Sequence, residues 1–141
     1  TYQSPPFAGC SIYSIRSANT TRMKTVYWLS TILTVLYLMW SAYSYLFSKA
    51  MIEGIEKLGF PNFFRIELAV LKIIAVAILL IPQIPLPIKD WAYVGIALFY
   101  LTAIIAHFAH NDPIIINLIN LVLLALLIVS NIYLRKLAGS L

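Results

Sequence analysis

A single lysine inside an otherwise apolar segment is the first residue that could do chemistry. Lys72 follows Arg65 by seven residues, so in a helix its ammonium lies about 10 Å deeper than Arg65. A charge at that depth in hydrocarbon costs about 2.5–3.5 kcal/mol and normally faces other helices. Glu67 lies about 140° around the same helix, so both side chains are expected to reach across to neighbouring helices. By depth, the expected partners of Lys72 are Glu67, Asn117, Asn120 or His107. A lysine that extends back toward the lipid head groups is the alternative.

Histidine and amide side chains gather near Asp112, between the third and fourth apolar segments. His107 and His110 are three residues apart, and Asn117 and Asn120 share one helical face just beyond Asp112. This spacing matches neither HExxH nor the Glu-x-x-His pair of di-iron proteins, so no metal site is predicted. Helix capping and hydrogen bonds between helices are the ordinary role for such groups, and ligand binding is the alternative.

The first apolar segment carries a stripe of hydroxyl groups on one helical face. Such side chains let membrane helices approach closely and form hydrogen bonds between helices, so packing is the leading interpretation. A polar lining for a ligand cavity is the alternative. The stripe consists of Ser30, Thr34, Tyr37, Ser41, Ser44 and Ser48. No catalytic residue is identified, and the candidate ligand-binding residues are Lys72, Glu67, His107, His110, Asn117, Asn120, Tyr37 and Ser41.

Several chemistries are excluded by what the sequence lacks. Cys10 is the only cysteine, so neither an internal disulfide nor a thiolate metal cluster can form. Both histidines belong to one segment, which excludes haem ligation by two helices of one chain. No phosphate-binding loop or Ser-His-Asp pattern is present. The net charge of +5 does not indicate nucleic acid binding, because the basic residues are scattered at the ends of apolar runs.

The elements that must position these residues are long apolar segments. Of the 141 residues, 62% are hydrophobic and 11% are charged, against about 45–50% and 25% in soluble domains, and the mean hydropathy is +0.90. Four segments of about 20 residues each match the length of a membrane-spanning helix. They cover residues 25–47, 63–81, 91–110 and 114–134, with Gly and Pro between them. The expected fold is all-α: an antiparallel bundle of four transmembrane helices in contact with the lipid bilayer.

The first connection has a helical pattern of its own, over residues 48–58. Its apolar residues Met51, Ile52, Ile55 and Leu58 share one face, its charged residues share the other, and Gly59 follows as a stop. This pattern predicts a short amphipathic helix at the membrane interface. A plain extension of the first helix is the alternative.

The chain divides into three parts by composition. Residues 1–22 are polar and without periodicity, which predicts a disordered leading tail, and Met23 is expected to be the natural start. Residues 23–137 form the expected transmembrane domain, and residues 138–141 a short C-terminal tail.

Basic residues in the short connections predict the orientation. With the N-terminus inside, more of them face the cytoplasm, so both termini are expected there. The inner side then holds Arg16, Arg22, Lys24, Lys89, Arg135 and Lys136, and the outer side holds Lys49, Lys57 and Arg65. Boundary aromatics, among them Tyr45 and Trp91, fit the interfacial belt of membrane proteins.

Several short motifs resemble those of the DoxX-like family of small bacterial membrane proteins. They are Lys57-Leu58-Gly59-Phe60-Pro61, Glu67-Leu68-Ala69-Val70-Leu71-Lys72, Leu79-Leu80-Ile81-Pro82, Lys89-Asp90-Trp91-Ala92-Tyr93-Val94-Gly95 and Asp112-Pro113. The resemblance covers residues 23–136. The wider family is named after a subunit of an archaeal thiosulfate:quinone oxidoreductase, and other relatives are linked to membrane redox complexes.

The resemblance implies a small accessory subunit of a membrane redox or quinone-linked system in the bacterial inner membrane. Partner membrane or redox proteins and a quinone ligand would follow from that role, since no other cofactor is evident from the residues. A small transporter or channel that uses Lys72 and Glu67 is one alternative. A non-catalytic assembly factor that binds partners through the hydroxyl stripe is the other.

Overall fold

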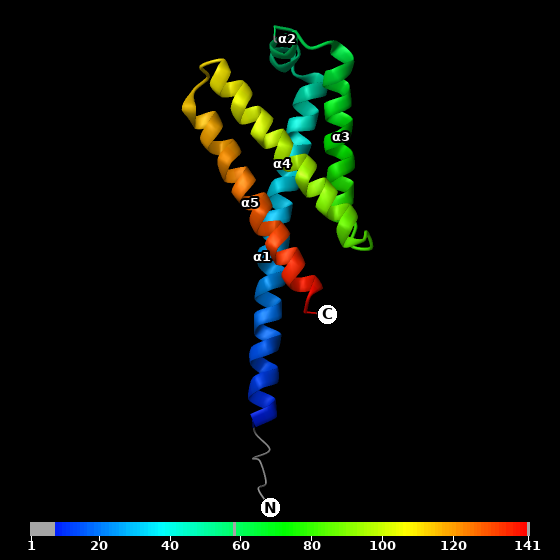
Figure 1. Cartoon of the computed structure of the whole chain (residues 1–141), viewed down its shortest axis with the longest axis vertical. Helices are drawn as coiled ribbons and strands as arrows, with labels where there is room; N and C mark the ends of the chain where they lie inside the picture. Colours follow the sequence, from blue (N-terminus) through cyan, green and yellow to red (C-terminus); the bar gives the residue numbers. More distant parts are fainter. Residues whose placement is uncertain (1–7, 58, 141) are drawn as a thin grey trace, which may run out of the picture.

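The computed structural model describes residues 8–57 and 59–140, and within this part of the chain all regular secondary structure is helical, without strands. Five helices follow one another (Figure 1). They are α1 (Ala8–Phe47), α2 (Lys49–Lys57), α3 (Asn62–Leu80), α4 (Leu86–Ala109) and α5 (Ile114–Ala138).

Proline, glycine and asparagine set the limits of these helices. Pro61, Pro85 and Pro113 stand directly before α3, α4 and α5, where a missing N–H costs no helical hydrogen bond. Gly59, after α2, has a φ of 80°, and Asn111, between α4 and α5, has a φ of 54°. These left-handed conformations suit glycine and asparagine, and they end the preceding helices.

The start of α1 corrects one expectation. Residues 1–22 were expected to form a disordered tail, yet the structure is helical from Ala8 onward, and residues 1–7 lie outside the described part. The hydroxyls of Thr20, Thr21 and Thr25 donate to carbonyls four residues earlier, which is compatible with the helix. The side chains of residues 14–22 are mostly exposed. The segment lacks apolar periodicity because it has few neighbours to pack against, and not because it lacks helical structure.

The amphipathic segment forms a separate helix, α2. Ile55 is buried, Met51 and Ile52 are half-buried, and Glu53 and Glu56 are exposed, as the pattern predicts. The helix contacts both α1 and α3 and lies across their shared end in Figure 1. Its position at a membrane interface stays a prediction.

The four long helices form a ring of neighbours. α1 contacts α3 and α5, while α4 contacts α5 and α3. Between them lies an apolar core in which Leu38, Leu79, Ile96 and Leu127 are almost fully buried. α3 and α4 meet near their connection and diverge toward α2 (Figure 1).

Length and composition make this a membrane protein. Within the described residues, three helices are long and apolar enough to cross a bilayer: Ser14–Phe47 of α1, and α4 and α5 in full. α3 is not among them, because its 19 residues include Arg65, Glu67 and Lys72. Large apolar side chains such as Leu36 and Leu98 are exposed around the bundle, as contact with lipid requires.

A buried hydroxyl network joins three of the helices on the side of the bundle formed by α1, α4 and α5. The Ser130 hydroxyl lies 2.7 Å from the Thr31 hydroxyl and 2.7 Å from the Tyr93 hydroxyl. Thr31 also donates to the carbonyl of Tyr27 at 2.7 Å. All of these side chains are buried, so the network satisfies polar groups that would otherwise be unpaired.

Replacing Ser130 by Ala should lower the free energy of unfolding by about 0.5–1.5 kcal/mol, the usual range for such bonds in membrane proteins. The reason is that the buried Tyr93 hydroxyl loses its partner. Unfolding in mild detergent measures the effect. Thr25→Ala is the matched control, because its exposed hydroxyl bonds only within α1. Equal stability of both variants would contradict a stabilising role for the network.

Candidate ligand-binding site

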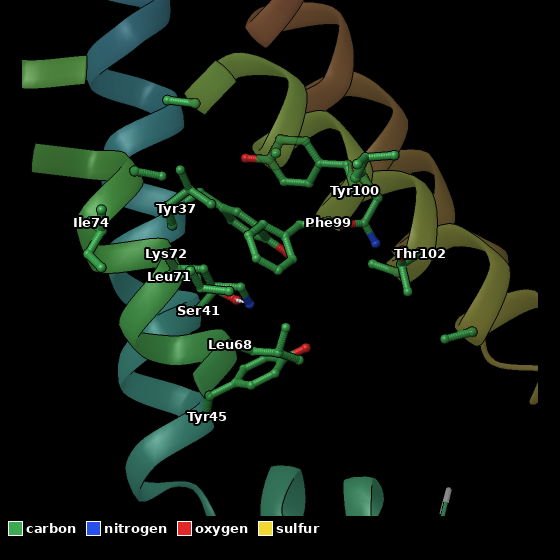
Figure 2. Close-up of a pocket in the computed structure, with 18 of the residues that line it drawn as sticks. Tyr37, Ser41, Tyr45, Leu68, Leu71, Lys72, Ile74, Phe99, Tyr100 and Thr102 are labelled. Atoms are coloured by element: carbon green, nitrogen blue, oxygen red, sulfur yellow. Dashed lines mark hydrogen bonds between the residues drawn. The ribbon is translucent and has the colours of Figure 1, made fainter. Parts of the chain in front are cut away.

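A cavity of about 670 Å³ opens between α1, α2, α3 and α4, with one residue from α5 (Figure 2). Its walls are mostly aliphatic and aromatic, and they include a few polar side chains. The polar lining residues are Tyr37, Ser41, Tyr45, Lys72, Tyr100, Thr102, His107 and Asn120. A volume of this size is typical of pockets for small molecules.

Lys72 is the only charged lysine or arginine side chain that lines this cavity within the described part of the chain. Its ammonium donates to the Ser41 hydroxyl at 2.8 Å and lies 3.6 Å from the centre of the Tyr45 ring (Figure 2). The Phe99 ring centre is 5.6 Å away on the other side. The side chain is only 5% exposed. The expected inward orientation of Lys72 is therefore what the structure has.

The partners of Lys72 are not those expected. Its ammonium contacts Ser41, Tyr45 and Phe99, and not Glu67, Asn117, Asn120 or His107. Depth along the bundle, from which these partners were inferred, does not say which face of a neighbouring helix is closest. α1 packs against α3, and Ser41 of the hydroxyl stripe takes that position.

Glu67 lies outside the pocket. It is exposed, five residues before the buried Lys72 on α3, as their angular separation requires. The structure thus corrects the expectation that both charged groups reach inward, and the two do not line a common path.

Two tyrosines stand above Lys72 in the pocket. The rings of Tyr37 and Tyr100 have centres 6.1 Å apart, which brings α1 and α4 together at this level. The Tyr100 hydroxyl is buried and has no hydrogen-bond partner within the described residues. A buried hydroxyl without a partner costs free energy.

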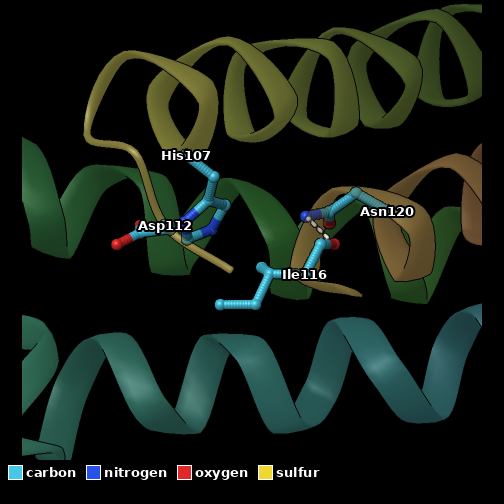
Figure 3. A network of polar contacts seen from close by, with 4 residues as sticks. All are labelled: His107, Asp112, Ile116 and Asn120. Carbon is cyan, nitrogen blue, oxygen red and sulfur yellow. Dashed lines mark hydrogen bonds and ion pairs between the residues drawn. The ribbon is translucent and has the colours of Figure 1, made fainter. Parts of the chain in front are cut away.

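At the other end of the pocket, His107 pairs with Asp112 (Figure 3). The His107 Nδ1 and the Asp112 carboxylate are 2.7 Å apart, and both side chains are partly exposed. Asn120, across from them on α5, donates to the carbonyl of Ile116 at 3.1 Å. These bonds fit the capping role weighed for this cluster.

The pocket therefore brings together only part of the candidate set. Tyr37, Ser41, Lys72, His107 and Asn120 line it. The exposed His110 and the half-buried Asn117 do not, although the Asn117 side-chain oxygen is buried without a partner in the described part. Over the same residues, no three His, Cys, Asp or Glu side chains are grouped as a metal site would need.

The sequence analysis missed the aromatic walls around Lys72. Tyr45 was assigned to the interfacial belt, but it follows Tyr37 by eight residues and Ser41 by four, and so it continues their stripe. That spacing could have placed it in the pocket. Phe99 has no comparable signal, because its position depends on the crossing of α4 over α3.

Comparison with known proteins identifies the family. The model of the DoxX-like family matches residues 28–130, a range that contains every residue lining the pocket. No curated protein and no solved structure matches the chain. Because the match covers well over half of the 141 residues, this chain belongs to the DoxX-like family.

Proposed function

We propose that this DoxX-like membrane protein holds a lipid-soluble ligand in the Lys72 pocket, as a small accessory subunit of a membrane redox or quinone-linked system. One observation carries the proposal: an apolar cavity of about 670 Å³ surrounds a buried ammonium. Such a charge is costly in a membrane protein and is normally kept for a function.

A quinone is the ligand class that this role requires, and the pocket residues fit one. The carbonyl oxygens of a quinone accept hydrogen bonds, and the ammonium of Lys72 can donate one. Its chain would lie along aliphatic walls such as Leu68 and Leu71. Electrons would come from a partner redox protein, while this chain binds and orients the ligand.

The geometry favours this proposal over the two alternatives. A transport path would need both Lys72 and Glu67 along it, but Glu67 is exposed and does not line the cavity. An assembly factor would present the α1 hydroxyl stripe to partners, but Ser30 and Thr34 are buried inside the bundle.

Filling the pocket tests the proposal. Gly95 lines the cavity, and a Cβ built there would meet nothing within 4 Å, so Gly95→Phe should occupy the pocket without disturbing the packing. We expect mass spectrometry of the gently purified wild type to detect a retained lipophilic molecule and Gly95→Phe to lose at least about nine-tenths of it.

Val94→Phe is the matched control, because it adds the same ring on the neighbouring, exposed residue outside the pocket. Val94→Phe should retain the ligand. Retention by Gly95→Phe as well, or no lipophilic molecule in the wild type, would count against ligand binding in this cavity.

We further propose that α3 also spans the membrane, which gives four antiparallel transmembrane helices in the bacterial inner membrane. At 1.5 Å per residue, its 19 residues reach about 28 Å, and its Arg65 and Lys72 face the protein interior. The directions of the long helices in Figure 1, which alternate along the chain, support the antiparallel arrangement.

Both termini should then lie in the cytoplasm. The ion pair between Arg135 and Asp90, 2.9 Å apart, places Arg135 of α5 and Lys89, the neighbour of Asp90 on α4, at one end of the bundle, which supports this orientation. A reporter fused after Leu141 that works only in the cytoplasm should be active, and one inserted at Gly59 should not. The reverse pattern would invert the topology.

A further inference from the structure

Within the described part of the chain, the ammonium of Lys72 is buried without a counter-ion. Over the described residues, ion pairs join His107 to Asp112 and Arg135 to Asp90, and Lys72 belongs to neither. From this we propose that the pocket selects a lipid with an acidic head group, whose carboxylate or phosphate pairs with Lys72. The inference rests on the proposed function and narrows its ligand from any lipid-soluble molecule to an anionic one.

The contacts of Lys72 leave room for an anion. An ammonium has three N–H donors, and Ser41 accepts one of them at 2.8 Å. The face of the Tyr45 ring attracts the positive charge but accepts no conventional hydrogen bond. Since buried charges are normally paired, a ligand oxygen is the natural partner for a remaining donor.

Apolar side chains form the rest of the pocket around Lys72. Among them are Leu68, Ile74 and Phe99. Tyr100 lines the pocket as well, but its hydroxyl oxygen is enclosed by the protein, so the ammonium of Lys72 is the group that pairs with the anion. A single ammonium within apolar walls suits a ligand with an acidic head group and a hydrocarbon chain. It does not suit a small hydrophilic anion, which would leave the apolar walls uncovered.

The pocket is also open toward the bilayer. Leu71 and Ile74 of α3 and Ile88, Trp91 and Leu98 of α4 line it while they are themselves exposed on the apolar surface, Trp91 to 79%. These residues stand on the two helices that diverge toward α2 (Figure 1). A ligand can therefore enter sideways from the hydrocarbon, which makes a membrane lipid the source of the acidic group.

The charge of the head group is the property to test. Native mass spectrometry of the full chain in a neutral detergent would compare palmitate with methyl palmitate, which has the same chain but no charge. Phosphatidylglycerol and ubiquinone complete the series. We expect palmitate to bind on the order of tenfold to a hundredfold more tightly than its methyl ester, as expected for a charge-assisted hydrogen bond.

Variants assign the effect to Lys72. Lys72→Gln should reduce palmitate affinity to that of the ester, and Lys72→Arg should keep part of the preference. Glu67→Gln, a charge change on the exposed face of the same helix, should leave the preference for palmitate over its methyl ester unchanged. If phosphatidylglycerol shows the same dependence on Lys72, the acidic group is a phospholipid head, and if only palmitate does, it is a fatty acid.

The remaining outcomes separate this inference from the proposed function. Equal binding of palmitate and its ester, or binding of ubiquinone alone, would overturn the acidic ligand and leave a lipophilic pocket standing. Binding of none of the four lipids would overturn both.

Discussion

Replacing Lys72 by Met should leave the free energy of unfolding of the ligand-free protein within about 1 kcal/mol of the wild-type value. The substitution removes the cost of a buried charge, about 2.5–3.5 kcal/mol on insertion scales. It also removes the bond to Ser41 and the contact with the Tyr45 ring, which are together of similar size. Ser41 need not be left unpaired, because other α1 hydroxyls, such as that of Thr34, donate to a carbonyl four residues earlier.

The same substitution should remove half or more of the stabilisation by an acidic lipid. A ligand at a hundred times its dissociation constant adds about 2.7 kcal/mol to the stability of the state that binds it. Wild type should gain this amount with palmitate, whereas Lys72→Met, which should bind palmitate about tenfold to a hundredfold more weakly, should gain only about 0.4–1.4 kcal/mol at the same concentration. Unfolding in mild detergent, with and without palmitate, measures both quantities.

Glu67→Gln is the control for charge on α3, since this side chain is exposed and lies outside the pocket. It should behave as wild type with and without lipid. A Lys72→Met protein that is stabilised by palmitate as much as wild type would show that the lipid binds elsewhere. One that loses several kcal/mol without lipid would make Lys72 a structural residue.

The helix boundaries were largely predictable because they depend on local chemistry. Proline before α3, α4 and α5, and Gly59 after α2, act through their own backbones, so a pattern in the sequence is sufficient. The inward orientation of Lys72 was predictable for a related reason. Depth follows from counting residues along one helix, and the cost of a charge at that depth is general.

The partners of Lys72 depend on information that spacing does not contain. The rotation and crossing of α1 and α3 decide which side chains of α1 meet α3. For this reason Lys72 contacts Ser41 and Tyr45, and not the expected Glu67 and asparagines. The helical start of α1 was missed for a different reason. An exposed helix that contacts few neighbours has no apolar periodicity to detect.

Arg65 gives the second large effect, on stability. The sequence analysis used it only as a topology signal, yet it is 7% exposed and its Nη1 donates to the carbonyls of Tyr45 and Leu46, the latter at 3.2 Å. These carbonyls lie in the last turn of α1, where a helix runs out of N–H partners and its dipole attracts a cation. Asn62 holds the guanidinium in place, since its side-chain oxygen accepts from Nε at 3.0 Å and from Nη2 at 2.7 Å.

Arg65→Met should therefore destabilise the protein by about 2–3 kcal/mol, because it leaves partly buried carbonyls at the end of α1 without their charged donor. Arg65→Lys should recover only part of the loss, since an ammonium cannot reproduce the geometry of a guanidinium that bonds α1 and Asn62 together. Lys57→Met, which removes an exposed cation just before α3, should change stability by less than about 0.5 kcal/mol. Unfolding of the three variants in mild detergent gives the comparison. If Arg65→Met were as stable as Lys57→Met, the contact between Arg65 and α1 would not stabilise the fold. Apolar packing alone would then have to hold the α2 end of the ligand pocket together.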